Sequence, residues 1–328
     1  MKRRTILQAA AAAPLLAAPA TLWPKESGAQ DFTQPIRLIV PFNPGGTSDI
    51  LARLIAPSLG QRIGQSVVVE NRAGAGGNIG ADLVAKSRPD GHALVLLDIS
   101  VLATNPHLFP RLPFDSLRDL APVQMVVYAP YILAVNNQLP VQNAQELAAY
   151  AKANPGKLNA ANSGTGTLTH LVAASLANAW GGEVTHVPYR GGAPALTALV
   201  TNEANLTMAG ATQSQNFVVN NQMRGIAVTG PKRLAAVPNL PTFRELGWPE
   251  PDAGTWQGVL TQGNTPPATI ARLEREIAQV LTEPNIVRRI GEIGGEVRAE
   301  GAATFRRILT EQTESYGRII RANNIRLE

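Results

Sequence analysis

The sequence predicts an α/β protein built from two domains, and three features of the chain carry this prediction. The chain has 328 residues, which corresponds to two domains of roughly 150 residues each. Short apolar runs alternate with segments of helical periodicity, the pattern of parallel strands joined by crossover helices. Four loops rich in Gly, Ser, Thr and Asn follow strands of this series, two in each half of the chain. Loops of this kind at the strand ends of two domains predict a ligand cleft between the domains.

The first domain is expected to begin with a βαβαβ unit. Residues 36–40 are apolar apart from Arg37 and predict a buried strand. Apolar residues spaced three and four apart over residues 49–63 predict the helix that follows. The unit continues with a strand at 67–69, a helix at 79–86, a Pro-Asp-Gly turn at 89–91 and a strand at 93–97.

Prolines change the character of the chain after this unit. Four of them lie between residues 106 and 122, and we expect them to prevent any long element before a strand at residues 131–135. This stretch is where the chain is expected to cross into the second domain. A second α/β series then follows, with a helix at 144–153, a loop at 162–167, a helix at 168–180, a strand at 183–187 and a helix at 193–200.

The C-terminal part of the chain is expected to complete the first domain. A strand at residues 226–229 is predicted to return to that domain. Pro266 and Pro267 open a helix with apolar residues every three or four positions, and another helix spans residues 303–322. The predicted division is therefore a signal segment at 1–29, a first domain of 30–104 and 225–328, and a second domain of 105–224.

Residues 1–29 predict an export signal. A basic start precedes an apolar, alanine-rich run over residues 6–22, and prolines leave this run too weakly hydrophobic for a spanning helix. Arg3 and Arg4 resemble the twin-arginine signal, although an ordinary secretory signal also begins with basic residues, so both export routes stay open. We expect cleavage after Ala29, with a competing small-residue site upstream, and a periplasmic product.

The composition fits a folded protein and excludes several classes of function. Hydrophobic residues make up 45% and charged residues 16%, which is too apolar for a mainly disordered chain. The formal charge is +5, but much of it lies in residues 1–29, and aromatic residues are not interleaved with Lys or Arg. Nucleic acid is therefore not expected as a partner. Cysteine is absent, which excludes disulfides, thiolate metal sites and a cysteine nucleophile.

The residues predict no catalytic or metal centre. A nucleophile elbow of the form Gly-x-Ser-x-Gly does not occur. Ser163 and His170 are seven residues apart, across a loop and into a helix, which does not make a nucleophile and base pair. The four His and the acidic residues do not cluster at the spacing of metal ligands.

The glycine-rich loops are the candidate binding segments. The loop at 41–49 joins a strand to a helix, where backbone N–H groups face an anion and the helix start adds a positive end. It lacks the Gly-Lys-Ser/Thr of a P-loop and the spacing Gly-x-Gly-x-x-Gly, so a carboxylate is favoured over a nucleotide phosphate. A plain glycine turn capped by Ser48 or Asp49 is the alternative. The other three loops lie at 70–78, 162–167 and 187–194.

A series of motifs from about residue 35 to the C-terminus resembles the Bug family, the extracytoplasmic solute receptors of tripartite tricarboxylate transporters. The order and spacing of these motifs match the family pattern. They are Ile39-Val40-Pro41-Phe42, Pro44-Gly45-Gly46, Glu70-Asn71-Arg72, Gly74-Ala75-Gly76-Gly77-Asn78, Pro89-Asp90-Gly91, Ser163-Gly164-Thr165-Gly166-Thr167 and Val187-Pro188-Tyr189-Arg190-Gly191.

The resemblance implies a periplasmic-binding-protein, or Venus-flytrap, fold in which two α/β domains close on a small organic acid. It implies capture without catalysis, no cofactor, a monomer, and the membrane subunits of a transporter as partners. A ligand-sensing periplasmic subunit of a signalling system is an alternative within the binding proteins. A periplasmic hydrolase or isomerase that uses the same cleft is the alternative outside them.

The resemblance also implies binding roles for residues of both domains. Gly45, Gly46 and Thr47 would hold one carboxylate of the ligand. The residues expected to hold the other end or to line the cleft are Ser163, Thr165, Gly166, Thr167, Ser100, Tyr189 and Arg190.

Two departures from the family pattern bear on the ligand. Where the family commonly has acidic residues on the return strand, this chain has Asn205 and Ala209. Where residues rich in Gly or Ser usually follow the third strand, it has Asp98. The charge of Asp98 would repel a carboxylate unless the side chain points away or meets an amine. We therefore expect a ligand other than a plain dicarboxylate: an amino acid, an amide or an aromatic acid.

Overall fold

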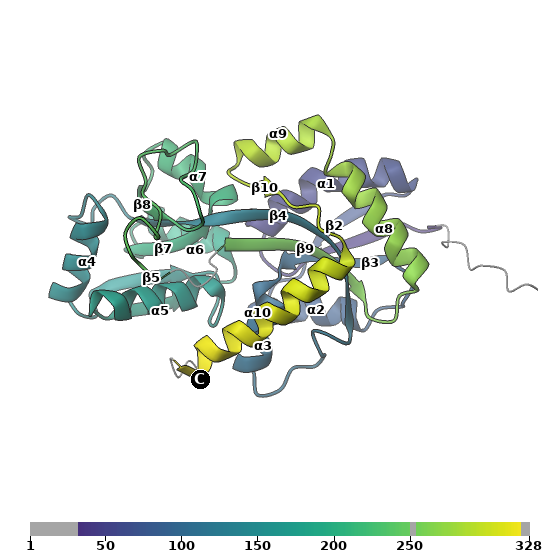
Figure 1. Ribbon diagram of the computed structural model, residues 1–328, viewed down its shortest axis with the longest axis horizontal. Coiled ribbons are helices and arrows are strands. Elements are labelled where there is room, and N and C mark those ends of the chain that lie inside the picture. Colours follow the sequence, from purple (N-terminus) through teal and green to yellow (C-terminus); the bar gives the residue numbers. More distant parts are fainter. Residues whose placement is uncertain (1–31, 250–253, 323–328) are drawn as a thin grey trace, which may run out of the picture.

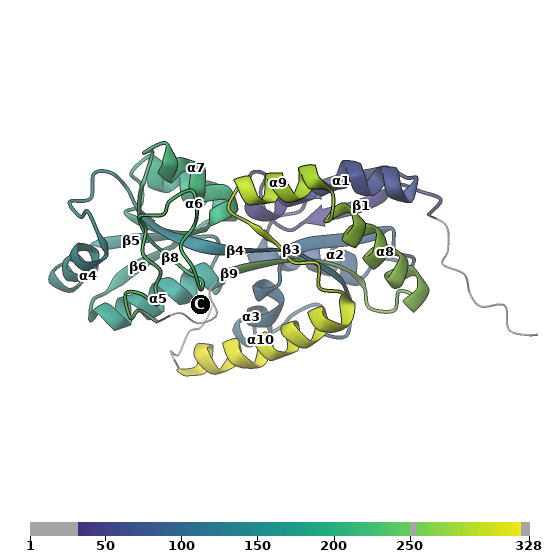
Figure 2. The ribbon, with the colours of Figure 1, turned by 45° about the horizontal axis from the view of Figure 1, so that its top comes forward.

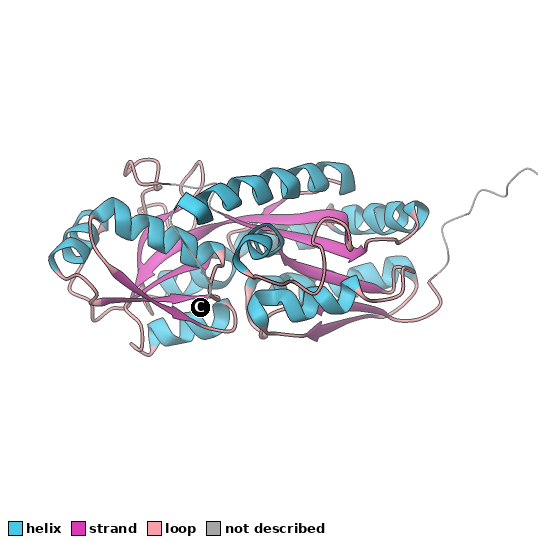
Figure 3. Cartoon of the chain, turned by 90° about the horizontal axis from the view of Figure 1, so that it is seen from below, coloured by secondary structure: helices cyan, strands magenta, loops and turns pink. Residues whose placement is uncertain are grey.

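The computed structural model describes residues 32–249 and 254–322, so the predicted export signal lies outside the described residues. Two α/β lobes lie side by side along the long axis of the molecule (Figure 1). The lobe that contains strands β1 to β3 is called the first lobe, and the lobe that contains β5 to β8 the second lobe. Helices cover both faces of the strands in each lobe (Figure 3).

The first lobe is built on three parallel strands in the order β2-β1-β3. The central strand β1 is buried except at Arg37, whose Nε lies 2.7 Å from Glu70 on β2. A strand covered on both faces needs a nearly continuous apolar run, which is what the sequence shows here. The elements of this part are β1 (Ile36–Val40), α1 (Thr47–Ile63), β2 (Val67–Asn71), η1 (Ala75–Gly77), α2 (Asn78–Ala85), β3 (Ala93–Asp98) and α3 (Ser100–Leu108).

The second lobe repeats the arrangement, with β5 parallel to both β6 and β7. The predicted helices and strands are confirmed to within a residue or two, because each has its own local periodicity, whereas the strands at 158–162 and 206–210 and the helix at 211–219 were not predicted. The elements are α4 (Ala144–Ala153), β5 (Leu158–Asn162), α5 (Leu168–Trp180), β6 (Val184–Pro188), α6 (Gly192–Val200), β7 (Leu206–Gly210), α7 (Ala211–Val219) and β8 (Arg224–Val228).

One long strand, β4 (Leu120–Val135), runs from the first lobe into the second. It pairs with β9 (Gly254–Gln262) up to Pro130, and with β7 and β8 from Tyr131 onward. The expectation that prolines would prevent a long element here is wrong. Pro122 lies where the register with β9 shifts, and Pro130 lies where β4 exchanges its partner strands. A residue without an N–H fits a strand at such interruptions of the ladder.

Strand β8 pairs with β4 in the second lobe, so the expectation that residues 226–229 return to the first lobe is wrong. The return is made by β9, which pairs with β3 and with the first part of β4. A short apolar run does not determine which sheet edge it will join. Here the run joins the edge of β4. The domain division at residues 104 and 224 stays a prediction, and this pairing favours a second boundary between β8 and β9.

The C-terminal helices pack on the first lobe. Helix α10 (Ala302–Ala322) lies along α3 and against β4 (Figure 2). The predicted helices after residue 266 and over 303–322 are confirmed as α8 (Pro267–Val280) and α10, whereas α9 (Pro284–Glu292) and β10 (Glu296–Val297) were not expected. No helix in the described ranges combines the length and the apolar character needed to cross a membrane.

Candidate functional site

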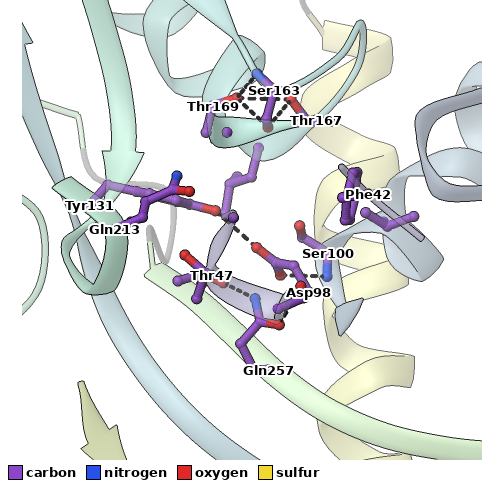
Figure 4. A pocket seen from close by; sticks show the side chains of 17 residues that line it. Phe42, Thr47, Asp98, Ser100, Tyr131, Ser163, Thr167, Thr169, Gln213 and Gln257 are labelled. Atoms are coloured by element: carbon purple, nitrogen blue, oxygen red, sulfur yellow. Dashed lines mark hydrogen bonds between the residues drawn. The ribbon is translucent and has the colours of Figure 1, made fainter. Parts of the chain in front are cut away.

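The strand ends of both lobes line a partly open cavity of about 60 Å³ (Figure 4). About 10–15 Å³ of such space holds one water molecule, so the cavity has room for several waters or a small organic ligand. Most lining residues are glycines or carry hydroxyl, amide or carboxyl groups, although the surface that they expose to the cavity is largely apolar. The lining residues are Phe42, Gly46, Thr47, Ser48, Asp98, Ser100, Val101, Tyr131, Ser163, Thr167, Leu168, Thr169, Gly192, Gly210, Gln213, Thr255 and Gln257.

The two lobes touch each other beside this cavity, and the arrangement with these contacts is called the closed form below. The hydroxyl of Thr212 on α7 donates to the hydroxyl of Thr47 on α1 across 2.8 Å, and both side chains are buried. Gly166 of the second lobe lies against Leu108 of the first, so closely that a Cβ at Gly166 would be 2.1 Å from Leu108 Cδ1. A glycine is required at this point for the lobes to come together.

Helix starts from both lobes converge on the cavity. The N-terminal residues of α1, α3, α5, α6 and α7 contribute to its lining. First-turn N–H groups have no partner within their helix, and a helix start carries partial positive charge. The arrangement can therefore hold a carboxylate without a cationic side chain. The N-caps of these five helices make no side-chain capping hydrogen bond; they are Gly46, Ile99, Thr167, Gly191 and Gly210.

Asp49 fixes the loop at 41–49 instead of capping α1. The N-cap of α1 is Gly46, so the alternative of a turn capped by Ser48 or Asp49 is wrong. Asp49 Oδ2 accepts the N–H of Gly45 at 2.9 Å and also bonds Arg53. Burial works against ionisation of Asp49, but its hydrogen bonds outweigh burial and lower the pKa of this carboxyl. Asp49 thus ties Gly45 to α1 and fixes the loop just ahead of the helix start that lines the cavity.

Asp98 points into the cavity (Figure 4). Its Oδ1 accepts the N–H of Ser100 and its Oδ2 accepts the hydroxyl of Tyr131, each at 3.0 Å. Burial raises the pKa of Asp98 above its usual value, and this effect outweighs the hydrogen bonds from Ser100, Thr255 and Tyr131, which lower it. Within residues 32–249 and 254–322, no Lys, Arg or His lines the cavity.

About half of the predicted site residues meet at this cavity. Those that line it are Gly46, Thr47, Asp98, Ser100, Ser163 and Thr167. Those that do not are Gly45, Thr165, Gly166, Tyr189 and Arg190.

Thr165, Tyr189 and Arg190 line a neighbouring hollow of about 720 Å³, which shares Phe42 and Ser163 with the cavity. Asn205 is remote from the cavity lining, and its Oδ1 accepts the N–H of Asn159. Ala209 is a buried β7 residue that is not in the lining either. The ligand contacts assigned to individual residues stay predictions.

Some of the lining residues that the sequence did not indicate come from β4 and β9, here called the connecting strands. Tyr131, Thr255 and Gln257 line the cavity, whereas Tyr128 and Trp256 line a groove of about 670 Å³ elsewhere. Alternate residues of a strand point to opposite faces. The groove therefore lies on the far side of the connecting strands from the cavity. The polar residues Thr255 and Gln257, two positions apart in β9, are the signal that could have found part of the first group.

The groove has walls from both lobes. Residues 229–236 and Gln215 line it from the second lobe, and residues 291–298 line it from the first. The rings of Tyr128 and Trp256 are 4.7 Å apart, and the guanidinium of Arg298 lies 5.8 Å from the Trp256 ring.

His170 ties the loop at 162–167 to α5, and this tie should make stability depend on pH. Its Nδ1 accepts the N–H of Gly166 at 3.0 Å, and its ring lies 4.2 Å from that of His186. Burial and the neighbouring His186 lower the pKa of His170 from 6.5 to about 4. The unfolded chain thus binds this proton at a higher pH than the folded chain, and stability falls as the pH drops from 6.5 toward 4.

We expect roughly 2–3 kcal/mol of stability to be lost through His170 over that interval. His170→Gln keeps an acceptor for Gly166 and removes the titration, so this variant should lose less stability between pH 7 and pH 4.5. Urea unfolding of both proteins at the two pH values measures the difference. Equal losses in the two proteins would show that His170 does not contribute.

Residues 51–325 match the model of a family described as the tripartite tricarboxylate transporter family receptor. Protein BugT of Bordetella pertussis is 32% identical over 296 residues, which cover 90% of this chain and 91% of BugT. The structure of the periplasmic binding protein BugD is 30% identical with a TM-score of 0.85, covering 90% of this chain and 99% of BugD. R. palustris Rpa4515, solved with adipate, is 32% identical with a TM-score of 0.86 and the same coverage. The predicted α/β fold is confirmed by these structures.

Proposed function

Because the chain belongs to the tripartite tricarboxylate transporter receptor family, a class of periplasmic solute-binding receptors, we propose that it captures a small carboxylate-bearing molecule and delivers it to membrane subunits of a transporter. The observation that carries this proposal is the convergence of uncapped helix starts from both lobes on one cavity between the lobes. The adipate in Rpa4515 supports an organic acid as the class of ligand. The mature protein then begins at Gln30 in the periplasm, and it binds without chemical change of the ligand.

Binding is coupled to closure because the ligand touches both lobes. One carboxylate lies against the N–H groups that begin α1 at Gly46 and Thr47, and the other end meets the hydroxyls of Ser163, Thr167 and Thr169. Only a closed cavity makes both sets of contacts at once, so the ligand shifts the population toward the closed form. The membrane subunits then distinguish loaded from empty receptor by its shape.

A thermal-shift screen of the protein from residue 30 onward tests the proposal. The panel contains mono-, di- and tricarboxylates, amino acids and aromatic acids. A ligand that binds only the folded state adds about 2.7 kcal/mol of stability at a hundredfold excess over Kd. We expect a dose-dependent shift from at least one acid, which mass spectrometry recovers unchanged. No shift from any acid would contradict the receptor function, and consumption of the acid would favour an enzyme.

Thr47→Val should weaken binding of the acid found in that screen by about tenfold. The substitution removes a hydroxyl that lines the cavity and accepts the hydrogen bond from Thr212 in the closed form. Leaving one buried hydroxyl without its partner costs about 1–3 kcal/mol. Isothermal titration calorimetry measures the change. Thr201→Val is the matched control, because Thr201 is exposed at the end of α6 and far from the cavity lining. Equal affinities of the two variants would contradict the assignment of Thr47.

A further inference from the structure

The charge in the cavity does not match a plain carboxylate ligand. The helix starts favour an anion, yet the carboxyl group of Asp98 points into the same small space. No Lys, Arg or His of the described chain lines the cavity to neutralise Asp98. Two carboxylates in one poorly solvated cavity repel each other. The ligand of this receptor therefore has to differ from a simple organic acid where it meets Asp98.

The hydrogen bonds around Asp98 indicate that it is an acceptor. The N–H of Ser100 and the hydroxyls of Tyr131 and Thr255 all point to its carboxyl oxygens. An ionised carboxylate accepts only, whereas a protonated one also has to donate. Donors thus surround Asp98 on the protein side.

A second row of side chains fixes the direction of these bonds. Ser48 Oγ donates to Gln257 Oε1 at 2.7 Å, and Gln257 Nε2 donates to Thr255 Oγ1. The Thr255 hydroxyl keeps its own hydrogen, which is available for a hydrogen bond to Asp98. These neutral donors orient the carboxylate, but they supply no net charge against it.

We propose that a cationic nitrogen of the ligand binds beside Asp98, so that the receptor selects amine-bearing acids, such as amino acids, over the corresponding plain carboxylates. This inference rests on the proposed function, and it assigns the two ends of the ligand. The carboxylate meets the helix starts, and the ammonium group meets Asp98. A charge-assisted pair in a poorly solvated cavity is roughly twice as strong as a neutral hydrogen bond.

A purely structural role of Asp98 is the competing explanation. The bond from the Ser100 N–H to Asp98 Oδ1, two residues earlier, is a local turn that leads into α3. Asn fills the same volume and keeps an acceptor oxygen for this turn, while it removes the charge. Asp98→Asn therefore separates the two roles. Tyr131→Phe is the matched control, because it removes one donor to Asp98 and leaves the charge in place.

Calorimetric titration of matched acids tests the inference. The pairs are aspartate and succinate, glutamate and glutarate, and phenylalanine and 3-phenylpropanoate, which differ within each pair only by the amine. We expect the wild-type protein to bind the amine-bearing member of the best pair at least tenfold more tightly. Asp98→Asn should remove or invert this preference by weakening the amine-bearing member tenfold or more. Tyr131→Phe should retain the preference.

Two results would overturn the inference while the receptor function stands. The first is that the wild-type protein binds the plain acids at least as tightly as their amine-bearing partners. The other is an Asp98→Asn variant that binds both members of a pair equally weakly, which would show that Asp98 only supports the fold of the site. Binding of no acid of either kind would contradict the receptor function itself, and the inference with it.

Discussion

Replacing Gly166 by alanine should weaken ligand binding by about 30-fold or more. Gly166 has a φ of +74° and lies where the second lobe meets Leu108 of the first. An added methyl group would lie 2.1 Å from Leu108 Cδ1, and Leu108 is itself buried, so its side chain has little room to move. Overpacking of this kind costs about 2 kcal/mol, which corresponds to roughly 30-fold in affinity. The cost falls on the closed form, because the contact exists only when the lobes meet.

A double substitution separates obstruction from general damage. In Gly166→Ala combined with Leu108→Ala, the space left by leucine accommodates the added methyl group. We expect this pair to regain most of the lost affinity, as measured by titration with the acid from the thermal-shift screen. The interaction free energy of the double-mutant cycle then gives the size of the contact. Additive losses in the double variant would contradict obstruction of closure as the cause.

Phe305→Ala should lower the free energy of unfolding by about 3–5 kcal/mol. Phe305 on α10 is fully buried, and its ring occupies the space above Gly258 of β9, where a Cβ would lie 2.3 Å from the ring. Ile99 lies against the same point and connects Asp98 to Ser100. Loss of the ring therefore leaves a cavity directly behind the part of the binding site that holds Asp98.

Urea unfolding of the ligand-free protein measures this effect, with Val219→Ala as the control. Val219 is 50% exposed at the end of α7, so its truncation should change stability by less than about 0.5 kcal/mol. A Phe305→Ala variant as stable as the control would show that α10 does not hold the first lobe together.

The elements with their own periodicity could be predicted from the sequence. Strand β1 and helices α4 and α5 begin and end where their apolar spacing and flanking residues indicate. The loops at the strand ends were also identified, and Gly46, Thr47, Ser163 and Thr167 lie at the cavity. These features depend on residues that are close together in the sequence, so one sequence is enough to predict them.

The features that were missed depend on contacts between distant parts of the chain. Tyr131 and Gln257 face the cavity because β4 and β9 pair in one register, and the bulges in β4 that set this register are not visible in a run of apolar residues. Strand β8 joined the second lobe because β4 extends there. Tyr189 and Arg190 lie in the neighbouring hollow because the angle between the lobes decides which part of a loop faces which space.

The connecting strands separate two hollows of the molecule. The ligand cavity lies on one side, and the groove between residues 229–236 and 291–298 lies on the other. If the proposed receptor opens by rotation of the lobes about these strands, we expect the walls of the groove to approach each other as the cavity opens. The width of the groove would then differ between loaded and empty receptor, on a surface that the ligand never touches.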